Sequence, residues 1–316
     1  MPIEPLDFDL VRKLRQNIES VILGKPEAVK LLVMSLLARG HVLIEDIPGI
    51  GKTALARALA RSITCAFRRI QFTPDLLPSD VTGVSIFDQE RKDFTFKRGP
   101  LFANIVLADE INRTTPRTQS ALLEAMNENH VSVDGVTHPL PAPFMVIATE
   151  NPLEFTGTYP LPESQLDRFL ILLRIGYPSI EEERRIVASR QNSDPVDRLE
   201  PALSGDDVNR LCQKVHEIRM DDSITNYALE IVARTRSDRN LIAGVSPRGA
   251  IHLTRAARAH AFVDGRDYTT PDDVKAVAPS VLSHRVIERR IRGPQDGRAS
   301  SSQIIRKILQ EVPVPQ

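Results

Sequence analysis

The sequence predicts an α/β fold in which a parallel sheet flanked by helices is followed by a second, all-helical domain. Three observations support this prediction. A glycine-rich turn separates an apolar segment at 42–44 from an alanine-rich helical segment at 54–60. Two further apolar segments, 104–110 and 144–152, each run into polar residues, as buried parallel strands do at a sheet edge. Beyond residue 179 the periodic segments have helical spacing.

The glycine-rich turn reads Pro48-Gly49-Ile50-Gly51-Lys52-Thr53, and its strand–turn–helix context is that of a phosphate-binding loop. Glycines allow the backbone to curl around a phosphate, and the helix start offers unpaired N–H groups at the positive end of the helix dipole. We expect Lys52 to reach the β- and γ-phosphates and Thr53 to bind Mg²⁺. The residues expected to bind the nucleotide are Pro48, Gly49, Ile50, Gly51, Lys52, Thr53 and Ala54. The alternative is an ordinary turn before a core helix.

Position 46 departs from the common pattern of such loops, in which a glycine precedes the lysine by six residues. The sequence has Asp46 there. Aspartate adopts the left-handed backbone conformation more readily than most residues other than glycine. The turn therefore remains possible with Asp46 at this position.

The apolar segments at 104–110 and 144–152 would bring polar side chains to one edge of the sheet. The first ends in Asp109 and Glu110, and the second in Asn151. Ligands of parallel sheets bind beyond the carboxyl ends of the strands. We expect Asp109 to hold Mg²⁺, Glu110 to act as general base toward the attacking water, and Asn151 to orient that water. Taken alone, each pattern also fits a structural strand that ends in a polar turn.

Several motifs occur in a fixed order along the chain: the phosphate loop and segments 109–113, 120–126, 149–152, 166–169 and 246–249. Together they resemble a MoxR-type ATPase of the AAA+ superfamily, over nearly the whole chain. The resemblance implies an AAA+ P-loop core, with β-hairpin inserts in its parallel sheet architecture, and a C-terminal all-helical lid. It also implies ATP and Mg²⁺ as cofactors.

The resemblance assigns roles to two arginines. Arg168, in Asp167-Arg168-Phe169, matches the arginine finger, which would act on ATP bound by the neighbouring subunit. Arg248, in Ser246-Pro247-Arg248-Gly249, matches the sensor-2 arginine, which would contact the γ-phosphate from the lid of the same subunit. Phosphoryl transfer depends on charge stabilisation, and an arginine finger contributes about 10³–10⁵ in rate. The alternative for each arginine is a surface salt bridge.

Two β-hairpins are predicted within the core. Alternating segments at 84–87 and 93–96 form the first, and 130–137, centred on Asp134-Gly135, forms the second with a type I′ turn. In ring ATPases such hairpins often line the central channel, and the alternative is that they only extend or cover the sheet. The resemblance also places the adenine contact near Gly24, where the alternative is a simple helix stop.

Composition restricts the class of protein. The chain has 316 residues, which suggests two domains, and its 41 basic and 41 acidic residues give a formal net charge of zero. This balance argues against non-specific nucleic-acid binding, and we expect the pair Arg68-Arg69 to be solvated. No apolar run approaches the roughly 20 residues that span a bilayer, and no signal peptide is visible. Cys65 and Cys212 are expected to be reduced thiols of a cytoplasmic protein.

Three regions are expected from these patterns: an ATPase core at 1–178, a helical lid at 179–292 and a polar tail at 293–316. Within the tail, 293–302 is polar and rich in small residues, which is typical of a mobile segment. Residues 304–309 are predicted to form one last short helix.

The sequence therefore predicts an ATP hydrolase that works as a homo-oligomeric ring, expected to be a hexamer. By resemblance, it would be a chaperone that remodels or matures client protein complexes, with a partner that carries a von Willebrand factor A domain. Two alternatives stay open. One is a helicase-like nucleic-acid motor, against which the neutral charge counts. The other is a nucleotide-gated scaffold with little turnover, against which the presence of Glu110, Asn151 and Arg168 counts.

Overall fold

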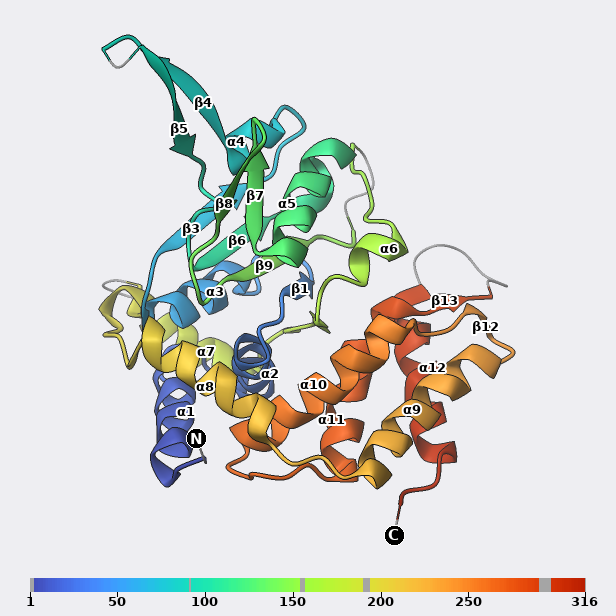
Figure 1. The fold of residues 1–316 in the computed structure, drawn as a ribbon. Helices are drawn as coiled ribbons and strands as arrows, with labels where there is room; N and C mark the ends of the chain where they lie inside the picture. Colours follow the sequence, from blue (N-terminus) through green and yellow to red (C-terminus); the bar gives the residue numbers. More distant parts are fainter. Residues whose placement is uncertain (1–2, 91, 154–156, 190–193, 290–296, 316) are drawn as a thin grey trace.

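The centre of the molecule is a five-stranded parallel sheet with the strand order β10–β1–β9–β6–β3 (Figure 1). The computed structural model describes residues 3–90, 92–153, 157–189, 194–289 and 297–315. The sheet strands are β1 (Val42–Glu45), β3 (Phe67–Gln71), β6 (Ile105–Asp109), β9 (Met145–Glu150) and β10 (Ile171–Leu173). Because all neighbours pair in parallel, the carboxyl ends of the strands meet at one edge and the amino ends at the other. The predicted α/β architecture is confirmed.

Both faces of this sheet are buried along β1, β6, β9 and β10, as the uninterrupted apolar strands predicted. Alternate residues of β1 enter different cores: Val42 and Ile44 face one cluster, and Leu43 faces the other. The same alternation holds in β6 and β9. Side chains of successive strand residues point to opposite faces, so helices must cover both sides. The helices of this part are α1 (Pro5–Glu19), α2 (Pro26–Leu37), α3 (Lys52–Arg61), α4 (Pro78–Thr82), α5 (Pro116–Glu128) and α6 (Glu163–Leu166), with a 3₁₀ turn, η1 (Ile111–Arg113).

Two antiparallel hairpins stand on the core, and both were predicted. The first pairs β4 (Gly83–Asp88) with β5 (Asp93–Arg98) and projects away from the body of the molecule (Figure 1). The second pairs β7 (His130–Val133) with β8 (Val136–Pro139). Its turn residues Asp134 and Gly135 both have positive φ, 51° and 77°, as a type I′ turn requires.

Two short strand pairs escaped prediction because strands of two or three residues show no alternation. β2 (Ile63–Thr64) pairs with β11 (Leu203–Ser204), and β12 (Leu241–Ala243) pairs with β13 (Ile287–Glu288). Each pair joins segments that are far apart in the sequence. The β2–β11 pair joins the C-terminal half to the segment that follows α3. The β12–β13 pair joins the segment between α9 and α10 to the segment that follows η3.

The C-terminal half is helical, as predicted, but its last helix is longer than expected. The elements are α7 (Ile180–Ser189), η2 (Pro195–Arg198), α8 (Gly205–Glu217), α9 (Asp222–Ser237), α10 (Pro247–Val263), α11 (Pro271–Leu282), η3 (Ser283–Arg285) and α12 (Gly297–Glu311). Of the predicted mobile segment 293–302, the first four residues lie outside the described residues, and the rest is helical. Ile305 and Ile308 of α12 are fully buried against the lid, and this packing orders a polar sequence that composition alone assigned to a tail.

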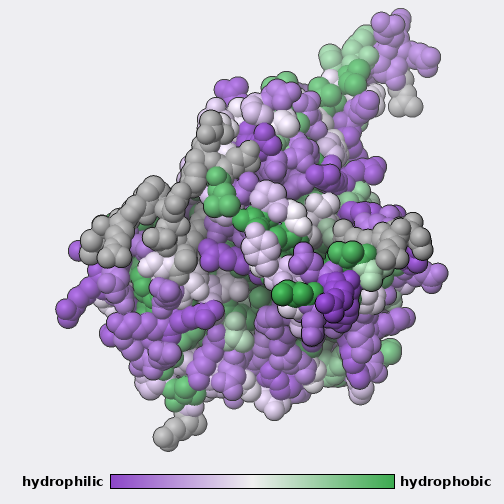
Figure 2. All heavy atoms as spheres, turned by 180° about the vertical axis from the view of Figure 1, so that it is seen from behind, coloured by the Kyte–Doolittle hydropathy of each residue, from purple (hydrophilic) through white to green (hydrophobic). Residues whose placement is uncertain are grey.

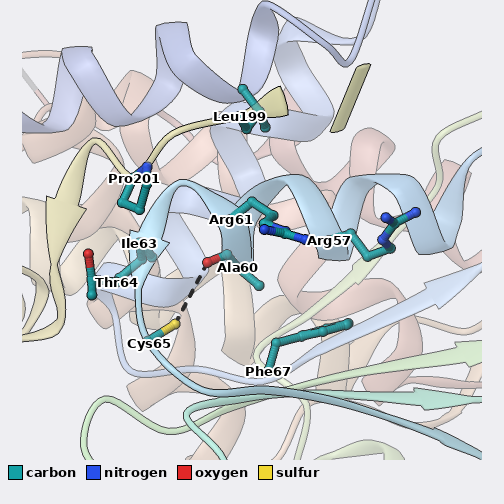
Figure 3. Close-up of a pocket in the computed structure, with 9 residues that line it drawn as sticks. All are labelled: Arg57, Ala60, Arg61, Ile63, Thr64, Cys65, Phe67, Leu199 and Pro201. Atoms are coloured by element: carbon teal, nitrogen blue, oxygen red, sulfur yellow. Dashed lines mark hydrogen bonds between the residues drawn. The ribbon is translucent and has the colours of Figure 1, made fainter. Parts of the chain in front are cut away.

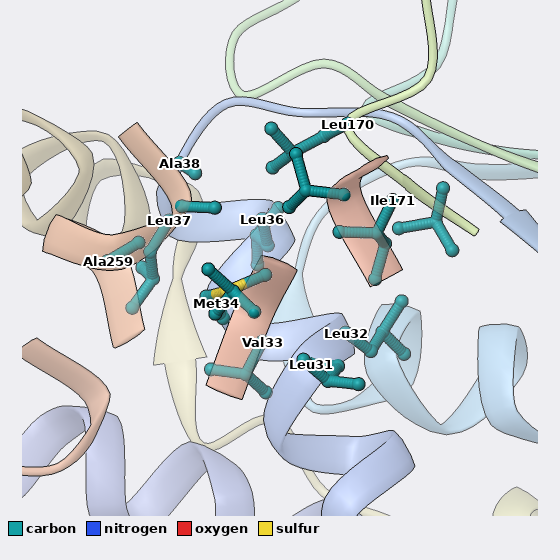
Figure 4. Close-up of a cluster of buried hydrophobic side chains, with 14 of the residues drawn as sticks. Leu31, Leu32, Val33, Met34, Leu36, Leu37, Ala38, Leu170, Ile171 and Ala259 are labelled. Atoms are coloured by element: carbon teal, nitrogen blue, oxygen red, sulfur yellow. The ribbon is translucent and has the colours of Figure 1, made fainter. Parts of the chain in front are cut away.

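Helix α2 connects the two halves. Its apolar side chains gather with Leu170 and Ile171 on the sheet side and with Ala259 of α10 on the lid side (Figure 4). A helix that is apolar on nearly all sides is buried between two layers. The lid is therefore packed on the core beside β10. The domain boundaries at residues 178 and 292 stay predictions. Among the described helices, none is both long enough and apolar enough to cross a membrane.

Candidate active site

The turn between β1 and α3 has the backbone of a phosphate-binding loop. Gly51 is the N-cap of α3 with φ 98°, and Gly49 has φ 84°. Residues with a Cβ adopt these angles at a cost of about 1–2 kcal/mol, so the glycines serve backbone conformation. α3 begins at Lys52, and the N–H groups of a first helical turn lack partners within the helix. The loop is thus suited to bind an anion at the carboxyl edge of the sheet.

The turn forms without a left-handed backbone at Asp46, which is not among the described residues with positive φ. Its carboxylate instead accepts hydrogen bonds from the backbone N–H groups of Ile175 and Gly176, both at 2.8 Å, and of Ile47 at 3.0 Å. The charge therefore clamps the start of the loop to the chain leaving β10. This clamp is the physical reason that an acid can stand where glycine is common.

Lys52 is buried where the carboxyl ends of β1 and β9 meet. Its Nζ donates to the carbonyl oxygens of Asp46 at 2.5 Å and Glu150 at 3.1 Å. Burial lowers the pKa of Lys52, and the surrounding carboxylates, Asp109 first among them, oppose that shift. The ammonium is therefore held beside the loop by backbone acceptors, at the position where the sequence placed it.

Asp109 and Glu110 are joined by a residue to which sequence analysis gave no role. The hydroxyl of Thr149, fully buried at the end of β9, donates to Asp109 Oδ1 at 2.6 Å. It also accepts from the backbone N–H of Glu110 at 2.9 Å. Glu110 itself has φ 58°, so the chain turns sharply as it leaves β6. Thr149 thus fixes the relative positions of the expected metal ligand and the expected base.

The edge strand β3 supplies partners to both acids. Arg69 donates to Asp109 Oδ2 through Nη2 at 2.7 Å and Nε at 3.1 Å. Gln71 donates to Glu110 Oε2 at 2.8 Å, and Arg113 donates to the same oxygen at 2.9 Å. The expectation that Arg69 is merely solvated is wrong: its side chain is 51% exposed but holds a buried carboxylate. Lone polar residues on an edge strand carry no signal of such a partner.

Asn151 and Gly24 have local contacts within the chain. Asn151 follows β9 at the carboxyl edge, and its Oδ1 accepts from the backbone N–H of Leu153 at 3.2 Å. Gly24 has φ 73°, and a Cβ there would come within 2.0 Å of the side chain of Glu182 at the start of α7. The segment around Gly24 therefore packs against the chain that leaves the sheet after β10. Their roles toward water and adenine stay predictions.

Arg168 and Arg248 lie together in a cavity of about 480 Å³ at the other edge of the sheet. The cavity borders residues 39–41 before β1, residues 141–144 before β9, and Leu170 before β10. These are the amino ends of parallel strands, whereas the phosphate loop follows the carboxyl end of β1. Strands of four to six residues at about 3.3 Å per residue put the two edges about 13–20 Å apart.

This position corrects one expectation. Arg248 was expected to contact ATP bound by its own subunit, but here it lies beside Arg168 and far from Lys52. The reason is the packing of α10 onto α2, which sequence patterns do not reveal. Arg168 donates to the carbonyl oxygen of Leu123 in α5 at 2.7 Å.

The cavity is strongly cationic. Two more arginines line it, Arg39 and Arg255, and none of the described lining residues is acidic. Burial, followed by the nearby guanidinium groups of Arg285, Arg255 and Arg248, lowers the pKa of His252 to about 3. This imidazole is therefore neutral near pH 7. The positive charge of the cavity comes from guanidinium groups, which bind phosphate oxygens well.

Comparison with known proteins identifies the family and the fold. Residues 41–171 match the model for the ATPase family associated with various cellular activities (AAA), and residues 233–308 match the AAA lid domain. Chaperone MoxR1 of Mycobacterium tuberculosis is 41% identical, over 95% of this chain and 81% of its own length. The uncharacterized protein YeaC of Bacillus subtilis is 51% identical, over 97% of this chain and 95% of its own.

The chain belongs to the MoxR family of AAA+ ATPases. A solved structure from Cytophaga hutchinsonii, described as a candidate ATPase, has the same fold, with a TM-score of 0.88 and 36% identity over 98% of this chain and 96% of its own. The resemblance inferred from the motifs is therefore confirmed. The lid match reaches residue 308, which agrees with the ordered packing of α12.

This MoxR-family protein has a second cavity, of about 450 Å³, beside the last turns of α3 (Figure 3). It contains none of the predicted site residues. Burial raises the pKa of the Cys65 thiol on its wall to about 11, so the thiol is protonated near pH 7 and a poor nucleophile. At its rim Arg57 is engaged by Asp194 at 2.9 Å and Asp197 at 2.5 Å. We assign no chemistry to this cavity.

Proposed function

We propose that this protein hydrolyses ATP with Mg²⁺ in an active site shared between neighbouring subunits of a ring. The observation that carries the proposal is the separation of two groups of residues. Lys52, Asp109 and Glu110 lie at the carboxyl edge of the sheet, and Arg168 and Arg248 line a cavity at the amino edge. One subunit does not bring both groups to the same γ-phosphate. Two neighbouring subunits, each contributing one edge, do.

The first half of the proposed site binds the nucleotide. The loop from Pro48 to Ala54 takes the phosphates, with Lys52 next to the β- and γ-phosphates, and Gly24 lies near the adenine. Thr53 and Asp109 offer the oxygen ligands that Mg²⁺ prefers. The contact with Arg69 supports Asp109 as a metal ligand, because the buried carboxylate of Asp109 already pairs with a positive group, the Arg69 guanidinium. Bound Mg²⁺ supplies neutralisation of the developing phosphate charge.

The same half also handles the attacking water. Glu110 accepts a proton as the water oxygen bonds to the γ-phosphorus and the bond to the bridging β–γ oxygen breaks. Gln71 and Arg113 orient its carboxylate at 2.8 and 2.9 Å. Asn151, at the end of the neighbouring strand, positions the water. General-base catalysis of this kind is worth about 10²–10⁴ in rate.

The second half comes from the next subunit. Arg168 and Arg248 would place two guanidinium groups against the γ-phosphate, where negative charge accumulates in the transition state. The cavity is suited to this because none of its described lining residues is acidic. Water is displaced when the interface closes, which strengthens the interaction between the arginines and the phosphate.

The proposed work of the ring is that of a chaperone on client proteins. The relative named chaperone MoxR1 supports this role, and so does the β4–β5 hairpin. Phe87 and Phe94 on this hairpin are 50% and 67% exposed and form an edge-to-face pair with centroids 5.4 Å apart. Green apolar side chains lie along the projecting hairpin in Figure 2, with a hydrophilic tip. Such a surface suits contact with an extended polypeptide. A von Willebrand factor A domain protein is the candidate partner.

Two measurements test the shared site. The ATPase rate per subunit is measured against protein concentration with Mg²⁺ present and the mass measured alongside, and it is expected to rise as the ring assembles. Lys52→Ala subunits are then mixed with Arg168→Ala subunits, each nearly inactive alone. Recovery is expected, because some interfaces combine an intact loop with an intact arginine cavity. A monomer with a concentration-independent rate, or no recovery on mixing, would overturn the proposal.

A further inference from the structure

We propose that Asp167 is a positioning residue that holds Arg168 and Arg248 in one cavity and ties both to the lid. The inference rests on the proposed shared site, since it concerns the residues that would act on the neighbour's γ-phosphate. Asp167 follows α6 and lies beside Arg168 in the chain. It needs no contact with ATP to act. Its role is to fix two guanidinium groups that come from sequence positions 80 residues apart.

The carboxylate of Asp167 bonds to the helix that carries Arg248. Ser246 donates its hydroxyl to Asp167 Oδ2 at 3.0 Å. The same Ser246 is the N-cap of α10, where its Oγ accepts from the backbone N–H of Gly249 at 3.2 Å. Arg248 is the second residue of that helix. The start of α10, and with it Arg248, is thereby anchored to the residue that precedes Arg168.

The other carboxylate oxygen bonds to a buried arginine of the lid. Arg285, in η3, donates its Nε to Asp167 Oδ1 at 2.8 Å, and only 1% of its side chain is exposed. It also donates to the backbone carbonyl oxygens of Asp167, Phe169 and Leu170. A buried guanidinium needs a counter-charge and full hydrogen bonding. Arg285 thus fastens the whole segment around Arg168 to the lid.

The tight packing leaves little freedom at this joint. A Cβ on Gly249 would come within 2.9 Å of Arg285 Cδ, so the first turn of α10 passes directly over the guanidinium stem. The imidazole of His252, one turn further, contacts the same guanidinium. A change in the angle between lid and core would therefore move Asp167, and both arginines would shift together. Misplacing catalytic groups by about 1 Å is enough to lower rates about 10²-fold.

The test uses assembled rings of Asp167→Asn, which keeps the size of the side chain and removes its charge. We expect kcat to fall about ten- to a hundredfold, with the affinity of the subunit's own loop for ATP unchanged within about twofold. Mixing with Lys52→Ala subunits is expected to restore activity, because the defect lies only in the arginine edge. A purely structural defect would not recover in this way.

Asp273→Asn is the matched control. Asp273 is also a buried lid carboxylate, bonded by an arginine, Arg266, and by the N-cap hydroxyl of Thr270, but it lies outside the arginine cavity. We expect this variant to lower the melting temperature and to keep kcat. Equal losses of kcat in both variants would mean that Asp167 acts only through lid stability.

Ser246→Ala keeps the ion pair with Arg285 and serves if Asp167→Asn does not fold. It is expected to lower kcat less, about three- to tenfold, with recovery in the same mixture. Normal kcat in both variants, or no recovery on mixing where Arg168→Ala does recover, would overturn the inference alone. If Arg168→Ala itself failed to recover, the shared site and the inference would fall together.

Discussion

The two edges of the sheet differ in charge and in how they are built. At the carboxyl edge, Lys52, Asp109 and Glu110 follow directly from strands or begin a helix, and each has a fixed partner within a few residues of a strand end. At the amino edge, the cavity collects four arginines from three distant segments and no described acidic residue. One edge therefore combines carboxylates with the buried Lys52 and with Arg69 and Arg113, whereas the charged residues described at the other edge are all arginines. Each lacks what the other offers to a metal-bound triphosphate.

The substitution with the largest expected effect on this difference between the two edges is at the amino edge. Arg168→Ala is expected to lower kcat about 10³–10⁵-fold and to spare ATP binding, because the guanidinium acts on charge that develops in the transition state. Single-turnover hydrolysis and ATP binding would be measured in parallel. The control is Arg219→Ala, whose side chain is 71% exposed, and it should leave both unchanged. Weakened ATP binding in Arg168→Ala subunits would place this arginine in its own subunit's site.

The next effect concerns the carboxyl edge. Glu110→Gln is expected to retain ATP binding and to lose hydrolysis by about 10²–10⁴-fold, because the amide does not accept the proton of the attacking water. The measurement is the steady-state rate together with the amount of ATP bound per subunit. Glu124→Gln, an exposed position on α5, is the control. A wild-type rate in Glu110→Gln would show that another group is the base.

Acid is expected to destabilise the amino edge through His41. Its Nε2 bonds to the carbonyl oxygen of Met126 and its Nδ1 accepts from the N–H of Val146, and burial lowers its pKa to about 4. The unfolded chain, with an ordinary histidine pKa of 6.5, then binds more protons than the folded one. The contribution of neutral His41 to the free energy of unfolding is complete above about pH 6.5. It is lost as the pH falls toward 4, by up to about 3 kcal/mol.

Denaturant unfolding between pH 4 and pH 7 would measure this loss. His41→Gln keeps a donor and an acceptor but does not titrate, so its acid-induced loss of stability should be smaller by about that amount. His252, with a pKa of about 3, titrates in the same direction and remains in both proteins as an internal reference. Equal pH dependence in the two proteins would mean that His41 is already protonated in the fold.

The smallest effect sharpens the description of the metal ligand. In the proposed site Arg69 competes with Mg²⁺ for Asp109, so Arg69→Ala is expected to lower the half-saturating Mg²⁺ concentration. The change is up to about fivefold, because a half-exposed ion pair is worth about 0.2–1 kcal/mol. Calorimetric Mg²⁺ titration of ATP-bound Glu110→Gln subunits measures it without turnover. Arg68→Ala, exposed on the same strand, is the control, and an increased Mg²⁺ requirement in Arg69→Ala would contradict the competition.

The same contrast explains what could be predicted from the sequence. The carboxyl edge depends on local order, since a glycine turn between strand and helix fixes Lys52, and an apolar strand fixes Asp109. Thr149 and Arg69 escaped because their contacts run between strands. The amino edge depends on how the lid packs, and no local pattern around Arg248 reveals that α10 lies on α2. The order of α12 was missed for the same reason, because its few apolar residues are buried only through their packing against the lid.

The opposite placement of the two proposed half-sites has a geometric consequence for assembly. A twofold dimer brings a surface against its own copy, so it does not join the loop of one subunit to the arginine cavity of the next. Only a head-to-tail contact does so, and such contacts either close into a ring or continue as an open row. In an open row, one end presents an unused loop and the other an unused cavity, so there is one complete site fewer than there are subunits. Closure into a ring removes both ends and adds one complete site. The resulting gain in complete sites per subunit is largest when the number of subunits is small.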